Sequence, residues 1–110
     1  MPPRWLTEPS DTAASAGQDV WLHCAAEGSP PPSVLWKKAV GSLPGEYRDL
    51  ALFDHHVNLL PNGTLHFVRI SKESEGHYMC EAGNSVGSDV SKVVFLKING
   101  TSRILALSPI

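Results

Sequence analysis

Apolar and polar residues alternate along several short segments of the chain, which is the pattern of β-strands with one buried face. The clearest example is residues 19–26, whose apolar side carries Val20, Leu22 and Cys24. Strands are also expected at residues 4–6, 12–15, 34–38, 47–50, 64–70, 77–82 and 88–99. The alternation therefore predicts an all-β protein in which two sheets bury their apolar faces against each other.

A second alternating segment places Leu65 and Phe67 inward and His66 and Val68 outward. Just before it, the dipeptide Asn62-Gly63 favours a tight hairpin turn, because both residue types tolerate positive φ. The stretch from 51 to 60 is less regular, and it predicts no clear boundary between two strands.

The spacing of one tryptophan and two cysteines narrows the fold. Trp36 follows Cys24 by twelve residues, which is enough to end one strand and return on the facing sheet. Tyr78 precedes Cys80 by two residues, where a phenol can reach back to the backbone at a strand corner. With the pattern Cys80-x-Ala82-x-Asn84-x-x-Gly87, these spacings resemble an immunoglobulin domain of the I-set branch.

That resemblance implies an all-β, immunoglobulin-like two-sheet sandwich. It also implies a disulfide between Cys24 and Cys80, the only cysteines of the chain, which would close a loop of 56 residues worth roughly 4 kcal/mol. The expected core side chains are Trp36, Tyr78, Leu65 and Phe67.

Disulfides persist in oxidising compartments, so the domain is expected outside the cell, at the cell surface. The alternative is an intracellular I-set domain in which the same two positions stay reduced as packed thiols. The segment Met1-Pro2-Pro3-Arg4-Trp5 is not a signal peptide, and no stretch is long enough to span a bilayer. We therefore expect a domain excised from a larger, membrane-anchored protein.

A chain of 110 residues is one domain by size. Residues 1–99 are assigned to the I-set domain. Residues 100–110 overrun the last strand and are interpreted as a linker remnant or an added extension.

The formal charge of −2 provides no basic surface, so nucleic acid is not expected as a partner. Catalysis is not expected either, because the Gly-x-Ser-x-Gly match at residues 83–87 falls in the expected turn between two strands and not in a strand-to-helix elbow, and no glycine-rich loop precedes a helix. The neighbours His55 and His56 would diverge on a strand, and no Cys-x-x-Cys or His-x-x-x-His spacing supports a metal site. We expect no metal and no cofactor.

Two Asn-x-Thr sequons occur, one beginning at Asn62 and one at Asn99, and either could carry a glycan in a secreted protein. The alternative for Asn62 is that its turn alone explains the residue. The sequon at Asn99 depends partly on the terminal extension.

If Cys24 faces the core, Trp21 and His23 must face outward, on the same outer sheet face as His66 and Val68. An exposed tryptophan beside histidines resembles the aromatic centre of a protein interface. Arg4 and Asn58 could border this face. The alternative is that neighbouring loops or Pro9 cover Trp21 within the same domain.

A closer resemblance is to the variable seventh immunoglobulin domain of arthropod Down syndrome cell adhesion molecules, and to the N-terminal domain of their shortened chelicerate forms. It is carried by four stretches: Pro2-Pro3-Arg4-Trp5, Trp36-Lys37-Lys38-Ala39-Val40-Gly41, Pro44-Gly45-Glu46-Tyr47-Arg48-Asp49-Leu50 and Asn62-Gly63-Thr64-Leu65-His66.

This resemblance implies neuronal self-recognition in which alternative splicing supplies many versions of the domain. Each version would pair in trans with a copy of itself, as an antiparallel two-fold homodimer through the outer face that bears Trp21, His23 and His66. Two alternatives from other classes stay open. One is a heterophilic receptor domain that binds a ligand or pathogen, and the other is a structural spacer in a chain of domains.

Overall fold

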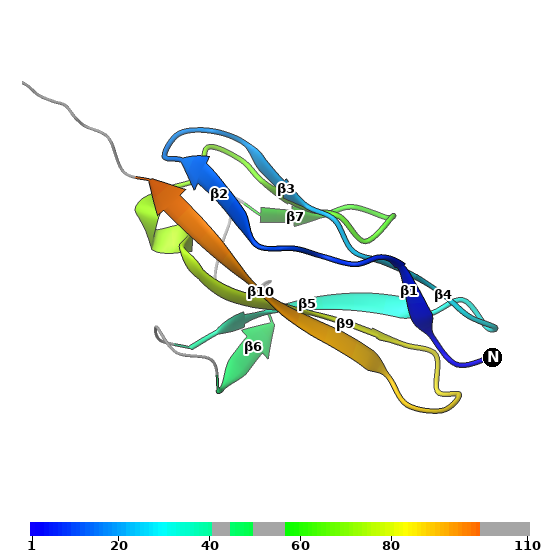
Figure 1. Cartoon of the computed structure of the whole chain (residues 1–110). Coiled ribbons are helices and arrows are strands. Elements are labelled where there is room, and N and C mark those ends of the chain that lie inside the picture. The colour runs from blue at the N-terminus through cyan, green and yellow to red at the C-terminus, as the bar shows by residue number, and fades with distance from the viewer. Residues whose placement is uncertain (41–44, 50–56, 100–110) are drawn as a thin grey trace, which may run out of the picture.

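The computed structural model describes residues 1–40, 45–49 and 57–99, which form two layers of antiparallel and parallel strands packed face to face (Figure 1). The elements, in chain order, are β1 (Arg4–Thr7), β2 (Thr12–Ser15), β3 (Val20–Leu22), β4 (Ala25–Glu27), β5 (Ser33–Ala39), β6 (Tyr47–Asp49), β7 (Val57–Leu59), β8 (Leu65–Phe67), the 3-10 helix η2 (Lys72–Ser74), β9 (Gly76–Gly83) and β10 (Val90–Asn99). The expected all-β, two-sheet sandwich is confirmed.

One layer contains the order β3-β8-β7, extended by the pair β1-β4, and the other contains β2-β10-β9-β5-β6. The first strand of the chain is divided between the layers. β1 pairs antiparallel with β4, and after the buried Pro9 the chain crosses over so that β2 pairs parallel with β10. The expected strands at 4–6 and 12–15 are thus both present, and β1 continues to Thr7.

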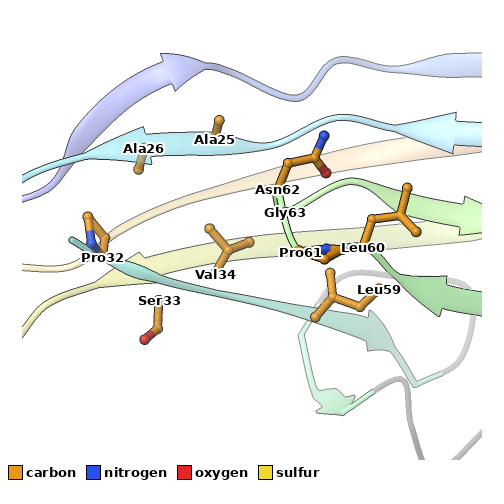
Figure 2. Close-up of a pocket in the computed structure, with 10 residues that line it drawn as sticks. All are labelled: Ala25, Ala26, Pro32, Ser33, Val34, Leu59, Leu60, Pro61, Asn62 and Gly63. Atoms are coloured by element: carbon orange, nitrogen blue, oxygen red, sulfur yellow. The ribbon is translucent and has the colours of Figure 1, made fainter.

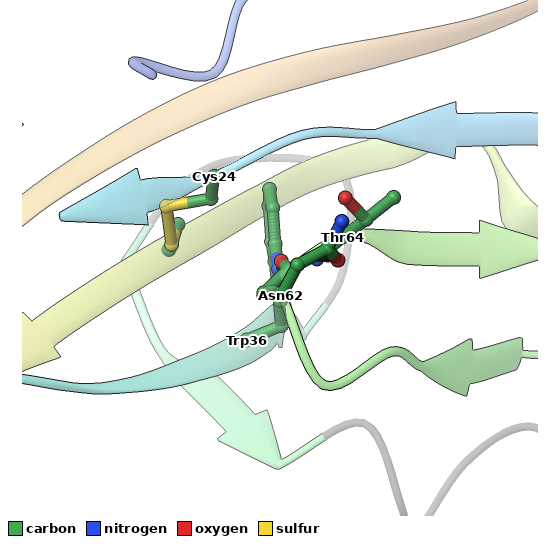
Figure 3. Close-up of a disulfide and its surroundings, with 6 residues drawn as sticks. Cys24, Trp36, Asn62 and Thr64 are labelled. Atoms are coloured by element: carbon green, nitrogen blue, oxygen red, sulfur yellow. Dashed lines mark hydrogen bonds between the residues drawn. A yellow bond between two sulfur atoms is a disulfide. The ribbon is translucent and has the colours of Figure 1, made fainter. Parts of the chain in front are cut away.

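The core lies between the layers and is built from the inward side chains of both. The disulfide between Cys24 and Cys80 joins the layers (Figure 3). Trp36 is 2% exposed and its indole Nε1 donates a hydrogen bond of 2.9 Å to the carbonyl of Gly63. The remaining members of the core cluster are Val20, Leu22, Leu65, Phe67, Ile70, Tyr78, Val94, Leu96 and Ile98.

Two expected strands are shorter than the alternation predicts, and the cause differs between them. The segment 19–26 is interrupted after Leu22, since β3 pairs with β8 whereas β4 pairs with β1. The segment 64–70 stops at Phe67, since Arg69 adopts a φ of 47°. The chain then bends so that the amide of Ile70 donates to the carbonyl of Gln18 at 2.8 Å.

The remaining strand ends differ less. β10 begins at Val90 rather than 88, and β6 covers Tyr47–Asp49 of the expected 47–50. β7 (Val57–Leu59) is the strand found in the irregular stretch 51–60. Residues 50–56, with the pair His55 and His56, and the expected extension 100–110 lie outside the described residues.

The corner before β9 uses the tyrosine as its spacing predicts. The Tyr78 hydroxyl donates a hydrogen bond to the carbonyl of the buried Ser74, at the end of η2. Nearby, Glu75 accepts from the Lys72 ammonium at 2.8 Å and from the Ile98 amide at 2.9 Å. These bonds fasten η2 to the end of β10. No helix within residues 1–40, 45–49 and 57–99 has the length and apolar character that crossing a membrane requires.

Candidate recognition face

A row of three side chains crosses the outer face of the β3-β8-β7 sheet. Trp21 pairs in register with His66, and His66 pairs with Asn58 on the far strand. Residues directly opposite each other on adjacent strands share a face and lie about 5 Å apart. We call Trp21, His66 and Asn58 the Trp21 row. The structure therefore brings together two residues that sequence reasoning assigned to one face, Trp21 and His66, and one that it placed at the border, Asn58.

The Trp21 side chain is held in place and remains accessible. Its ring stacks on the His66 ring with centroids 4.7 Å apart and planes 3° from parallel. Trp21 nevertheless stays 48% exposed, and His66 is half-buried. The indole is thus a fixed, apolar, solvent-facing surface, because the stack restricts its rotation while leaving its other face open.

Asp19 contacts the Trp21 row through His66, an interaction that sequence reasoning missed. Its Oδ2 lies 3.2 Å from His66 Nε2, and its Oδ1 accepts a hydrogen bond of 3.0 Å from the Arg69 amide. These two interactions, the Arg69 amide first, lower the pKa of Asp19 below its ordinary value of 3.8. An aspartate one residue before a strand is a local signal, but its partners lie about 50 positions away and no spacing rule identifies them.

His23 lies outward as expected but outside the Trp21 row. Its Nδ1 lies 3.0 Å from the hydroxyl of Thr64, which is itself buried. His23 also lines a small hollow of about 170 Å³ on this outer face, together with Thr7, Ala25 and Asn62. His23 is therefore on the same face, one alternation further along the strand than Trp21.

Two further residues expected on or beside this face, Arg4 and Val68, lie away from the Trp21 row. Arg4 forms an ion pair with Glu27 on the β1-β4 pair. Glu27 is six positions from Trp21, which is about 20 Å along a strand, so the fold does not bring Arg4 to the row. Val68 lies just past the end of β8 and is half-buried beside the bend at Arg69.

The opposite sheet also has an outer face with apolar residues, which sequence reasoning did not identify. Leu35 on β5 and Val93 on β10 are each 41% exposed. Between them, Lys37 and Glu81 form an ion pair at 3.2 Å. The alternation of β10, where Val94 is buried, would have been enough to predict that Val93 faces outward.

The two sequons differ in how much of them the structure describes. Asn62 is exposed at the tip of the β7-β8 hairpin, and all three residues of its sequon are placed. Asn99 is exposed at the end of β10, and the rest of its sequon lies outside the described residues. In the described ranges, no three His, Cys, Asp or Glu side chains lie close enough to bind a metal ion.

Comparison with known proteins gives the immunoglobulin family that the cysteine and tryptophan spacings resemble. A family model for the immunoglobulin domain matches residues 2–84. Cell adhesion molecule Dscam1 of Drosophila melanogaster is 47% identical over 98 residues, covering 89% of this chain and 5% of that protein. Cell adhesion molecule Dscam2 of the same species is 41% identical over 101 residues, covering 92% and 5%.

Solved structures agree with these sequences. The crystal structure of the N-terminal eight immunoglobulin domains of Down syndrome cell adhesion molecule (DSCAM) isoform 1.30.30 matches with a TM-score of 0.84. That match has 45% identity and covers 90% of this chain and 12% of the other. The chain thus spans a small part of its relatives, about a twentieth of the length of the two fly proteins. The chain belongs to the immunoglobulin domain family, and it resembles the domains of Dscam cell adhesion molecules.

Proposed function

We propose that this domain mediates homophilic recognition at the cell surface, by pairing with a second copy of itself through the Trp21 row. The observation that carries the proposal is the Trp21–His66 stack at the centre of an open sheet face, with Trp21 48% exposed. Rigid aromatic side chains dominate the binding energy of many interfaces, because they bury a large apolar area at little cost in conformational entropy. The names of the similar proteins, cell adhesion molecules, point in the same direction.

The chemistry of the row suits self-pairing. In an isologous dimer, residues near the two-fold axis meet their own copies, so a lysine or arginine there would face a like charge. Trp21 and Asn58 carry no charge, and the Asp19 carboxylate is already engaged by His66 and by the Arg69 amide. The row can therefore meet its copy without strong repulsion, and isoform specificity would come from charged residues at its edges.

The proposed location is extracellular, on a larger membrane-anchored parent. The Cys24–Cys80 disulfide supports an oxidising compartment. The chain occupies about a twentieth of the length of Dscam1 and Dscam2, so anchoring would be a property of the parent protein.

Sedimentation equilibrium of the isolated domain at increasing concentration tests the proposal. We expect a reversible monomer–dimer equilibrium. Because a central aromatic residue typically contributes at least 2 kcal/mol, Trp21→Ala should raise the dimer Kd by about 30-fold or more. His66→Glu should weaken pairing too, since it removes the stack and places a second carboxylate beside Asp19 in each copy.

Val93→Glu is the matched control, because it places a charge on an apolar position of the opposite face that is 41% exposed, close to the 48% of Trp21. It should leave the dimer Kd unchanged. Dimerisation that survives Trp21→Ala but is lost in Val93→Glu would move the interface to the other sheet. Circular dichroism of each variant checks that the fold is retained.

A heterophilic receptor function is the second candidate, favoured by the exposed Leu35 and Val93 on the outer face of the β10-β9-β5 strands. It predicts a monomer at high concentration, together with a separate cell-surface ligand whose binding Val93→Glu abolishes and Trp21→Ala does not. A spacer domain would tolerate both substitutions in adhesion assays of the parent protein.

A further inference from the structure

The β7-β8 hairpin presents Asn62 in a fixed orientation. The turn is closed by the Gly63 amide donating to the Leu60 carbonyl at 3.0 Å and by the Leu60 amide donating to the Thr64 carbonyl at 2.8 Å. The Asn62 side chain is fixed as well, because its Oδ1 accepts a hydrogen bond of 3.0 Å from the Thr64 amide. The oxygen of the side-chain amide therefore points into the turn.

The nitrogen of the same amide, Nδ2, can carry a substituent. Asn62 is exposed, and Figure 2 shows its side chain rising from the hairpin toward β4 with the amide nitrogen at its far end. A substituent on Nδ2 would keep the Oδ1 hydrogen bond and the turn intact. The next residue, Gly63, cannot carry a side chain in the same way, because an added Cβ would lie 2.2 Å from the Cys24 carbonyl oxygen.

We propose that Asn62 carries an N-linked glycan whose first sugar covers the hollow on the outer sheet face beside His23. Transfer forms a bond from Asn62 Nδ2 to the anomeric carbon of an N-acetylglucosamine-headed oligosaccharide. It breaks the bond from that carbon to the diphosphate of a lipid-linked donor, which departs as the lipid diphosphate while an Nδ2 proton passes to a base of the transferring enzyme. The proposal rests on the extracellular location of the proposed function and is independent of self-pairing.

Two hollows flank Asn62, and both reach β4 at Ala25. The larger, of about 530 Å³, extends from β4 to the start of β5, and it is lined by Pro32, Val34 and Leu59 among others (Figure 2). The smaller, of about 170 Å³, is lined by Thr7, His23 and Thr64 together with Ala25 and Asn62. Because the lining of the smaller hollow is the richer in polar side chains, the first sugar is placed over it.

The hydroxyls lining the smaller hollow suit a sugar. Thr7 and Thr64 are hydroxyl-bearing residues of the lining, and His23 and Ala25 complete it. His23 is two residues after Trp21, which is about 7 Å along the strand. The glycan would thus mark one edge of the recognition face and leave the Trp21 row open. It would also occupy the space between the row and the distant Arg4.

Occupancy is tested on the chain secreted from insect or mammalian cells. We expect peptide mass spectrometry to find glycan on Asn62, and peptide-N-glycosidase F to remove it and leave aspartate there. Asn62→Asp should abolish this modification while keeping a side-chain oxygen for the Thr64 amide. Asn99→Asp, the matched control, should not alter it. A secreted, folded chain with unmodified Asn62 would refute the proposal.

Placement is tested by carbethoxylation of histidines with diethyl pyrocarbonate, read by peptide mass spectrometry. His23 should react at least several-fold more slowly in the glycoprotein than in Asn62→Asp, because the first sugar covers its ring. His66 lies on the same face away from the hollow, so its rate should be equal in both proteins. Equal rates at His23 would refute the placement. Sedimentation of Asn62→Asp distinguishes failure of the glycan proposal from failure of self-pairing, because this variant should still dimerise.

Discussion

Gly63 is the residue on which the hairpin, the disulfide strand and the core all depend. Its φ is +92°, and an added Cβ would lie 2.2 Å from the backbone oxygen of Cys24. Its carbonyl also accepts the hydrogen bond from the Trp36 indole. Figure 3 shows Trp36 beside Asn62 and Thr64, the two chain neighbours of this glycine. A side chain at this position would therefore separate two backbone segments and displace the central tryptophan.

Gly63→Ala should lower the free energy of unfolding by roughly 3 kcal/mol, because it combines a steric clash with an unfavourable φ. Gly17→Ala isolates the second effect, since Gly17 has the same φ of +92° with nothing within 4 Å of its added Cβ. It should cost only about 1 kcal/mol. Urea unfolding followed by tryptophan fluorescence measures both. Equal losses would show that the close approach to Cys24 relaxes freely.

Tyr78→Phe should cost about 1–3 kcal/mol, because it leaves the carbonyl of the buried Ser74 without the phenol hydroxyl. Tyr47→Phe is the comparison. The Tyr47 hydroxyl is buried with no hydrogen-bond partner in the part of the chain that the structure describes. Its removal should be neutral or slightly stabilising. Thermal unfolding of the two variants decides between these expectations, and a larger loss for Tyr47→Phe would contradict them.

At the scale of single elements, the alternation predicted which way side chains face but not where strands end. The inward position of Cys24 fixed Trp21 and His23 outward, and the structure has them so. The break between β3 and β4 could not be read in the same way, because it reflects a change of partner from β8 to β1. The Asp19–His66 contact escaped prediction for a related reason, since two residues far apart in sequence meet only once the sheet forms.

The hydrogen bonds of Glu75 with Lys72 and with the Ile98 amide form a clamp between η2 and β10. This clamp makes the free energy of unfolding depend on pH. The hydrogen bond from Lys72, followed by that from the Ile98 amide, lowers the pKa of Glu75 below its ordinary value of 4.5. The unfolded chain then binds more protons than the folded one in this range. The contribution of Glu75 is complete above about pH 4.5 and is lost as the pH falls through its folded-state pKa.

Glu75→Gln should therefore flatten the fall in unfolding free energy between about pH 5 and pH 3, while keeping an oxygen for the Ile98 amide. Glu73→Gln, at an exposed position of η2, serves as the control and should retain the wild-type slope. Urea unfolding at a series of pH values gives the slopes. A wild-type slope in Glu75→Gln would remove this clamp as a source of acid sensitivity.

At the scale of the whole molecule, the two layers are joined covalently and by hydrogen bonds at separate points. The disulfide joins Cys24 to Cys80, and the Trp36 indole reaches the hairpin of the opposite layer. The chain itself makes the third connection, where it passes from β1 in one layer to β2 in the other. The layers therefore cannot slide past each other while these connections hold.

Reduction of the disulfide should lower the free energy of unfolding by roughly 4 kcal/mol, because the unfolded chain regains the freedom of a loop of 56 residues. Urea unfolding with and without a reductant measures the difference. The double variant Cys24→Ala, Cys80→Ala should show no effect of the reductant. A change below about 1 kcal/mol in the natural sequence would mean that the loop stays constrained by other contacts.

The parallel pairing of β2 with β10 gives the domain a resistance to mechanical force. The two strands run side by side in the same direction, with four residues of β2 in register from Thr12↔Leu96 to Ser15↔Asn99 (Figure 1). Tension that draws β2 back toward the N-terminus and β10 forward toward the C-terminus acts along the strands. It loads all the hydrogen bonds of the pair together in shear, instead of opening them one at a time. A domain pulled from both of its ends would thus yield only when the whole strand pair gives way.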